Sequence, residues 1–160
     1  MEINPREFIS IMFSLKEPLM SWNMIKSTID SLNFDLNDYG IFCTFNTNGV
    51  LLNDNILTYC REHCIDIHVS LDGPKDIHDK RRIYRNNKNQ HLSSHEKVLE
   101  IINKYPNYPM LSYMTTINKE DLLRVEEIFN YMTNLPISCF VYALNKFDDW
   151  DDESISILEK

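Results

Sequence analysis

Polar side chains follow two apolar runs of the chain, at the points where those runs end. Residues 39–45 and 65–69 are typical of buried strands, and a helical pattern separates them. The first run leads into Thr47-Asn48-Gly49 and the second into Ser70-Leu71-Asp72-Gly73-Pro74. Turn formation alone could explain each segment, because Asn-Gly and Asp-Gly readily adopt positive φ. Their recurrence in successive strand–helix units predicts instead a polar rim at the carboxyl ends of parallel strands, where α/β folds bind ligands.

A basic segment, His78-Asp79-Lys80-Arg81-Arg82, follows this rim and extends to Arg85 and Lys88. It could be a solvated loop, a clamp for an anion or carboxylate, or a nucleic-acid contact. An arginine presents a planar fork that matches a carboxylate, so the segment suits a ligand with an amino-acid end. The chain has 24 acidic residues against 16 basic ones, a formal charge of −8, and the basic segment is short. We therefore expect no nucleic-acid partner.

The cysteines indicate a reducing compartment. They lie in apolar strand or helix patterns rather than in a dense disulfide framework, at Cys43, Cys60, Cys64 and Cys139. Cys60 and Cys64 stand one helical turn apart on the face that carries Ile56, which is more typical of core thiols than of a metal site. No apolar run reaches transmembrane length, and the first residues lack a signal-peptide pattern. We expect a cytoplasmic protein without membrane association and without a metal site of its own.

The order of elements predicts an α/β fold. Expected strands lie at 8–13, 39–45, 65–71, 110–117 and 137–144, and expected helices lie between them, near 24–32, 53–64, 93–102 and 118–130. Residues 75–91 are polar and show little periodicity. Repeated β-α units imply a parallel sheet with right-handed crossovers, and five strands are too few for a closed eight-stranded barrel. We predict a curved parallel sheet with helices on its outer face in residues 1–147, followed by an acidic segment, 148–160.

In their order and spacing, these motifs resemble those of radical S-adenosylmethionine (SAM) enzymes, and within them the SPASM-type maturases of peptides and sulfatases. Residues 46–52 (NTNGVLL) resemble the family's TNG-x-LL segment, 68–74 (HVSLDGP) its SLDGP segment, and 78–82 (HDKRR) its HD-x-x-R segment. Upstream, Glu17-Pro18-Leu19 resembles the end of the family's GGEPLL strand. The resemblance covers about residues 8–144.

This resemblance implies a fold, two cofactors and the roles of four residues. The fold would be an incomplete (β/α)6 barrel, similar to part of a TIM barrel. SAM would lie across the strand ends and chelate a [4Fe-4S] cluster, and its reductive cleavage would start the modification of a peptide or protein. Glu17 would face the methionine amino group, and Asn48 would line the same rim. Ser70 and Arg82 would approach the ribose and the carboxylate.

The chain departs from the family pattern at the cluster and at a glycine pair. The family holds its cluster with three cysteines spaced C-x3-C-x2-C, because thiolates bind three of the irons. Only Cys60-x3-Cys64 begins such a spacing here, and its third position is Ile67. Leu15-Lys16 stand where the family has Gly-Gly, so side chains would crowd the pocket and Lys16 would repel an ammonium. The cysteines of the auxiliary-cluster region that follows the family's barrel are missing as well.

Two functions remain open on this basis. The first is a radical SAM maturase core that is catalytically incomplete alone, with a partner subunit or residues outside this sequence supplying the cluster loop at the exposed edge of the first strand. The second is a non-catalytic pseudoenzyme that binds a peptide or partner protein, for example by strand addition. A degenerate reading frame without a selected function is a third alternative.

Overall fold

The computed structural model describes residues 9–13, 16–31, 41–86, 88 and 90–158. Its main sheet contains β1 (Ile9–Phe13), β2 (Ile41–Thr47), β3 (Ile65–Ser70), β6 (Leu111–Ile117) and β7 (Phe140–Leu144). The helices between these strands are α1 (Trp22–Ser31), α3 (Asp54–Glu62), α5 (His95–Lys104) and α6 (Val125–Thr133), with the 3-10 helices η1 (Pro18–Ser21) and η2 (Lys119–Arg124). The strand order is β1-β2-β3-β6-β7, and every pairing is parallel. The predicted α/β fold with a parallel sheet is confirmed.

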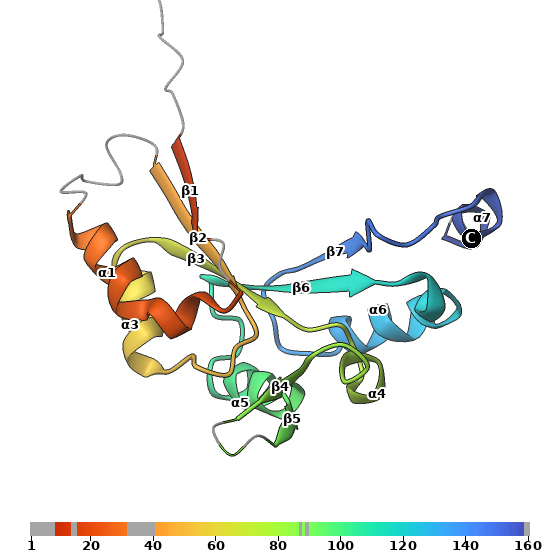
Figure 1. Cartoon of the computed structure of the whole chain (residues 1–160), viewed down its shortest axis with the longest axis horizontal. Coiled ribbons are helices and arrows are strands. Elements are labelled where there is room, and N and C mark those ends of the chain that lie inside the picture. Colours follow the sequence, from red (N-terminus) through yellow and green to blue (C-terminus); the bar gives the residue numbers. More distant parts are fainter. Residues whose placement is uncertain (1–8, 14–15, 32–40, 87, 89, 159–160) are drawn as a thin grey trace, which may run out of the picture.

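The helices cover one face of this sheet, as Figure 1 shows for α1, α3, α5 and α6. Odd-numbered residues of β3 and β6 are buried, whereas the even-numbered ones between them are partly or fully exposed. Because side chains alternate across a strand, the odd-numbered positions face the helices and form the core. Its large buried side chains include Phe45, Ile65, Ile67, Leu71, Ile102, Leu111, Ile128 and Met132. None of the helices in the described ranges is long and apolar enough to cross a membrane.

Residues 75–91 contain short regular elements that their weak periodicity did not predict. α4 (Lys75–His78) is a short helix, and β4 (Ile83–Arg85) pairs antiparallel with β5 (His91–Ser93) in a separate two-stranded sheet. These elements are too short to produce a periodic apolar pattern. The residues that flank the hairpin, Arg82 and Ser94, are hydrogen-bonded to each other, since Ser94 Oγ donates to the carbonyl oxygen of Arg82 at 3.3 Å.

The ends of α3 confirm one sequence prediction and correct another. Asn53 caps the helix as expected, with its side-chain oxygen accepting from the Ile56 N–H at 3.1 Å. Cys60 is buried in the core, but Cys64 lies beyond the helix end and is exposed. Its φ of 49° belongs to the turn that leads from α3 into β3. The prediction that both thiols share one buried helix face was therefore wrong for Cys64.

The remaining expectations concern element ends and the acidic segment. Residues 8, 15, 32, 39 and 40 lie outside the described residues, and the last strand begins at Phe140 rather than at 137. The acidic segment contains α7 (Asp152–Leu158). It is tied to η2 by Lys119, whose backbone N–H donates to Asp148 Oδ2 at 2.7 Å and whose Nζ pairs with Asp151. The division at residue 147 stays a prediction.

Candidate functional site

A cavity of about 300 Å³ lies at the carboxyl ends of four neighbouring strands, β1, β2, β3 and β6. This volume is at the lower end of the range for small-molecule sites. The cavity brings together three side chains that the sequence singled out, Asn48, Ser70 and Arg82. Its full lining is Met12, Phe13, Lys16, Asn46, Thr47, Asn48, Ser70, Arg82, Met114 and Thr116. The ligand-binding roles of the three residues stay predictions.

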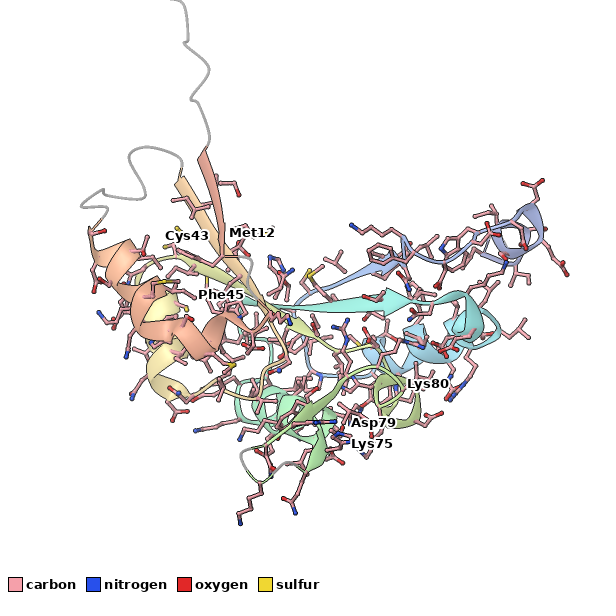
Figure 2. All side chains as sticks on the ribbon, viewed as in Figure 1. Met12, Cys43, Phe45, Lys75, Asp79 and Lys80 are labelled. Atoms are coloured by element: carbon pink, nitrogen blue, oxygen red, sulfur yellow. The ribbon has the colours of Figure 1, made fainter. Side chains whose placement is uncertain are left out.

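Strand alternation explains which side chains reach the cavity from the sheet. Cys43 and Phe45 of β2 point toward the helices and are almost fully buried, whereas Met12 of β1 points to the other side and is 58% exposed (Figure 2). Ser70 and Met114 are register partners on this second face. No helix of the described residues covers that face, so the cavity combines an open sheet surface with the loops that follow the strands.

Glu17 lies beside the cavity and is hydrogen-bonded to its own chain. Its Oε1 accepts from the Leu19 N–H at 3.2 Å and from the Thr47 hydroxyl at 2.7 Å, and its Oε2 accepts from the Asn48 N–H at 2.9 Å. The Thr47 oxygen in turn accepts from the Gly49 N–H. The carboxylate therefore caps η1 and fixes the 47–49 turn, and these bonds use three of its roughly four acceptor positions. Its contact with a ligand ammonium stays a prediction.

Arg82 is held in the cavity wall by Asp72. Its Nε donates to Asp72 Oδ2 at 2.7 Å, and its Nη2 donates to Asp72 Oδ1 at 3.2 Å and to Thr116 Oγ1 at 3.3 Å. The Asp72 side chain is 2% exposed and also accepts from the Thr116 N–H at 2.9 Å. Two arms of the arginine expected to bind a ligand carboxylate are thus occupied by a carboxylate of the chain itself.

A buried histidine, His78, connects Asp72 at the end of β3 to Ser94 at the start of α5. His78 Nδ1 accepts from the Asp72 N–H at 3.2 Å, so Nε2 carries the ring proton and donates to Ser94 Oγ at 2.9 Å. Burial lowers the pKa of His78 to about 4. The neutral imidazole is therefore a structural hydrogen-bonding bridge at neutral pH. The His95 ring lies 5.4 Å from the His78 ring, measured between centroids, and burial lowers the pKa of His95 as well.

The basic segment is largely neutralised by acidic side chains. Lys80 and Arg81 both pair with Asp121 of η2, whose side chain is 1% exposed, and Arg81 also pairs with Glu120. On α4, Lys75 pairs with Asp79, and Figure 2 labels both beside Lys80. The segment is therefore an ion-paired loop that contributes Arg82 to the cavity, and its role as a carboxylate clamp stays a prediction.

The described residues do not fit a [4Fe-4S] cluster. No cysteine lines the cavity, and no group of three or more His, Cys, Asp or Glu side chains in the described part of the chain could hold a metal. Burial raises the pKa of Cys60 to about 12 and also raises the pKa of Cys43, as expected for core thiols. Cys64 and Cys139 are exposed. Lys16 lines the cavity and adds a positive charge near Arg82.

No family model matches the chain. Curated relatives include the cysteine-type anaerobic sulfatase-maturating enzyme of Clostridium novyi, 28% identical over 61% of this chain and 25% of that protein. The radical SAM cyclopropyl synthase TigE of Paramaledivibacter caminithermalis is 30% identical over 62% of this chain and 20% of that protein. The chain spans less than half the length of the curated relatives it matches.

The fold is shared with a solved enzyme, anSMEcpe with bound AdoMet and the Cp18Cys peptide. The two align with a TM-score of 0.74 over 94% of this chain and 44% of that chain, at 15% sequence identity. Structural similarity at this identity establishes the fold alone. Together with the sequence matches, it supports a radical SAM-like domain within the radical SAM superfamily.

Sequence reasoning missed the groups that fix the cavity. Asp72 was treated as part of a turn, and Thr116 was placed only within a strand, yet both bind Arg82. One signal was available, because a buried-strand pattern that ends in Leu-Asp-Gly places a carboxylate at a buried position, which requires a partner. The HD-x-x-R resemblance singles out Arg82, but its pairing with Asp72 depends on the path of the loop and could not be read from spacing.

Proposed function

We propose that this chain is the middle of a SPASM-type radical SAM maturase-like core and that its cavity binds SAM. The five-stranded sheet would then be part of an incomplete (β/α)6 barrel whose inner face is the helix-free face. The observation that carries the proposal is the meeting of Asn48, Ser70 and Arg82 in one cavity at the strand ends. The shared fold and the radical SAM relatives support it.

The cavity's composition suits a ligand with apolar, hydroxyl and carboxylate parts. Arg82 would bind the methionine carboxylate through Nη1, which makes none of the bonds to Asp72. The Ser70 hydroxyl would hydrogen-bond to the ribose, and the Asn48 amide would line the same rim. Glu17 retains about one acceptor position for the amino group. Met12 and Met114 supply apolar surface.

We propose that the chain is catalytically incomplete alone, because its own residues do not fit a [4Fe-4S] cluster. The cluster loop would come from a partner subunit or from residues outside these 160. β1 is a natural joining surface, since it is the first strand in the sheet order and its outer edge pairs with no strand of the described residues.

A non-catalytic peptide- or protein-binding module is the second candidate. Two observations favour it. Lys16 places a positive charge in the cavity, where it opposes the ammonium and sulfonium groups of SAM. The Glu17 carboxylate, which could offset that charge, already accepts three hydrogen bonds from the chain.

Titration calorimetry with S-adenosylhomocysteine tests the proposal, because this analogue keeps the adenosine, the amino group and the carboxylate. We expect binding by the wild type and about tenfold weaker binding by Ser70→Ala and Arg82→Lys, from loss of a charge-assisted hydrogen bond. Arg124→Lys is the matched control, since Arg124 pairs with Asp76 and Glu127 and does not line the cavity. No binding by the wild type, or equal binding by all variants, would exclude a SAM site here.

A further inference from the structure

We propose that Asp72 is a positioning residue that sets the direction of Arg82 toward the ligand carboxylate. This inference rests on the proposed function, since it concerns the same cavity. It concerns a residue that does not line the cavity and that sequence reasoning assigned to a turn.

The contacts define the direction of the guanidinium group. Asp72 takes the side edge of the fork, formed by Nε and Nη2, at 2.7 and 3.2 Å. Thr116 adds a bond from its hydroxyl to Nη2 at 3.3 Å. Nη1 makes none of these bonds and is the arm left for a ligand. A bidentate pair fixes the plane of a guanidinium, which a single hydrogen bond cannot do.

Asp72 is itself held rigidly. Its side chain is 2% exposed, and Oδ1 accepts from the Thr116 N–H at 2.9 Å, so the carboxylate bridges the ends of β3 and β6. Positioning groups act well when their own orientation is fixed by packing and further hydrogen bonds. The Arg82 side chain is therefore oriented by a carboxylate that is itself bonded to the end of β6.

The backbone of Arg82 is fixed to the same residue by a second route. The Asp72 N–H donates to His78 Nδ1, the His78 ring donates to Ser94 Oγ, and Ser94 donates to the Arg82 carbonyl oxygen. The Arg82 side chain is thus bonded to the Asp72 carboxylate, and the Arg82 backbone is connected to the Asp72 N–H through Ser94 and His78.

A purely structural pair makes the opposite prediction for the ligand. If Asp72 only neutralises Arg82, its removal releases the guanidinium and strengthens the attraction to a carboxylate. If Asp72 positions Arg82, its removal weakens carboxylate binding. The two readings therefore differ in the sign of the effect.

The test compares Asp72→Asn with a matched control, Asp121→Asn. Asp121 is equally buried and pairs with Lys80 and Arg81, the two residues before Arg82. The probes are S-adenosylhomocysteine and 5′-methylthioadenosine, which lacks the amino-acid part. We expect Asp72→Asn to weaken S-adenosylhomocysteine binding about tenfold and to change 5′-methylthioadenosine binding less than twofold. Asp121→Asn should change neither.

The double variant shows whether Asp72 acts through Arg82. Adding Asp72→Asn to Arg82→Lys should weaken S-adenosylhomocysteine binding no further, because the group that it positions is already gone. Tighter binding by Asp72→Asn, equal weakening of both probes, or additive effects in the double variant would overturn the proposal.

A ligand-free measurement keeps the inference separate from the proposed function. Nitrogen–proton spectra should show a slowly exchanging Arg82 Nε–H in the wild type and in Asp121→Asn, and its loss in Asp72→Asn. If the wild type binds neither nucleoside, the proposed function fails. The positioning of Arg82 by Asp72 is then overturned only if the Nε–H signal survives in Asp72→Asn.

Discussion

At the scale of single residues, most polar side chains around the cavity already have partners within the chain. Glu17, Asp72 and His78 each join segments that are distant in sequence. A ligand would therefore meet a preorganised rim, which lowers the cost of ordering side chains on binding.

Glu17→Gln tests the role of the Glu17 carboxylate in holding the turn at 47–49. The amide replaces one acceptor oxygen by a donor, which would face either the Asn48 N–H or the Leu19 N–H and Thr47 hydroxyl. We expect a loss of about 1–2 kcal/mol in the free energy of unfolding, measured by urea denaturation. The exposed Glu126→Gln is the control. Equal stability of the two variants would show that the cap contributes little.

His78 should make the protein less stable in mild acid. Its folded pKa of about 4 lies below its ordinary value, so the unfolded chain binds more protons between pH 6.5 and 4. The full contribution is present above pH 6.5 and is lost as the pH falls toward 4, by roughly 3 kcal/mol in total. His95 acts in the same direction. Urea denaturation at several pH values should give a steeper loss for the wild type than for His78→Gln, and parallel slopes would refute this.

At the scale of elements, the turns that follow β2 and β3 contain glycines with positive φ, Gly49 and Gly73. Gly49 has a φ of 78°, and a Cβ there would lie 3.1 Å from both Val69 Cγ1 and Val98 Cγ2. We expect Gly49→Ala to lower the thermal midpoint, with a cost of more than about 1 kcal/mol. Asn107 is a useful contrast because it has a φ of 54° and is exposed. Asn107→Gly should be neutral or stabilising, and a loss equal to that of Gly49→Ala would contradict this account.

The main strands could be predicted from the sequence because their apolar runs are long and bounded by turn residues. The strand predicted at 65–71 is β3, Ile65–Ser70. The β4–β5 hairpin could not be predicted, because strands of three residues are too short to show a period. Asn48 and Ser70 were expected on one rim because parallel strands end at one edge. The Asp72–Arg82 pair depends on how α4 folds back and could not be found from spacing.

At the scale of the whole molecule, the sheet has one face covered by helices and one face open (Figure 1). Both outer strands, β1 and β7, have one edge without a partner strand among the described residues. Met12 of β1 and Val141 of β7 are exposed apolar side chains. These exposed edges are where we propose that a partner subunit would join.

Anaerobic reconstitution of the purified chain with ferrous iron and sulfide tests the central claim most directly. The measurement is cluster content per chain, followed by 5′-deoxyadenosine formation from SAM with dithionite as reductant. The described residues offer no cluster ligand set, so we predict no stable [4Fe-4S] cluster and no 5′-deoxyadenosine from this chain alone. A full cluster with SAM cleavage by these 160 residues would contradict the proposal that the domain is catalytically incomplete alone.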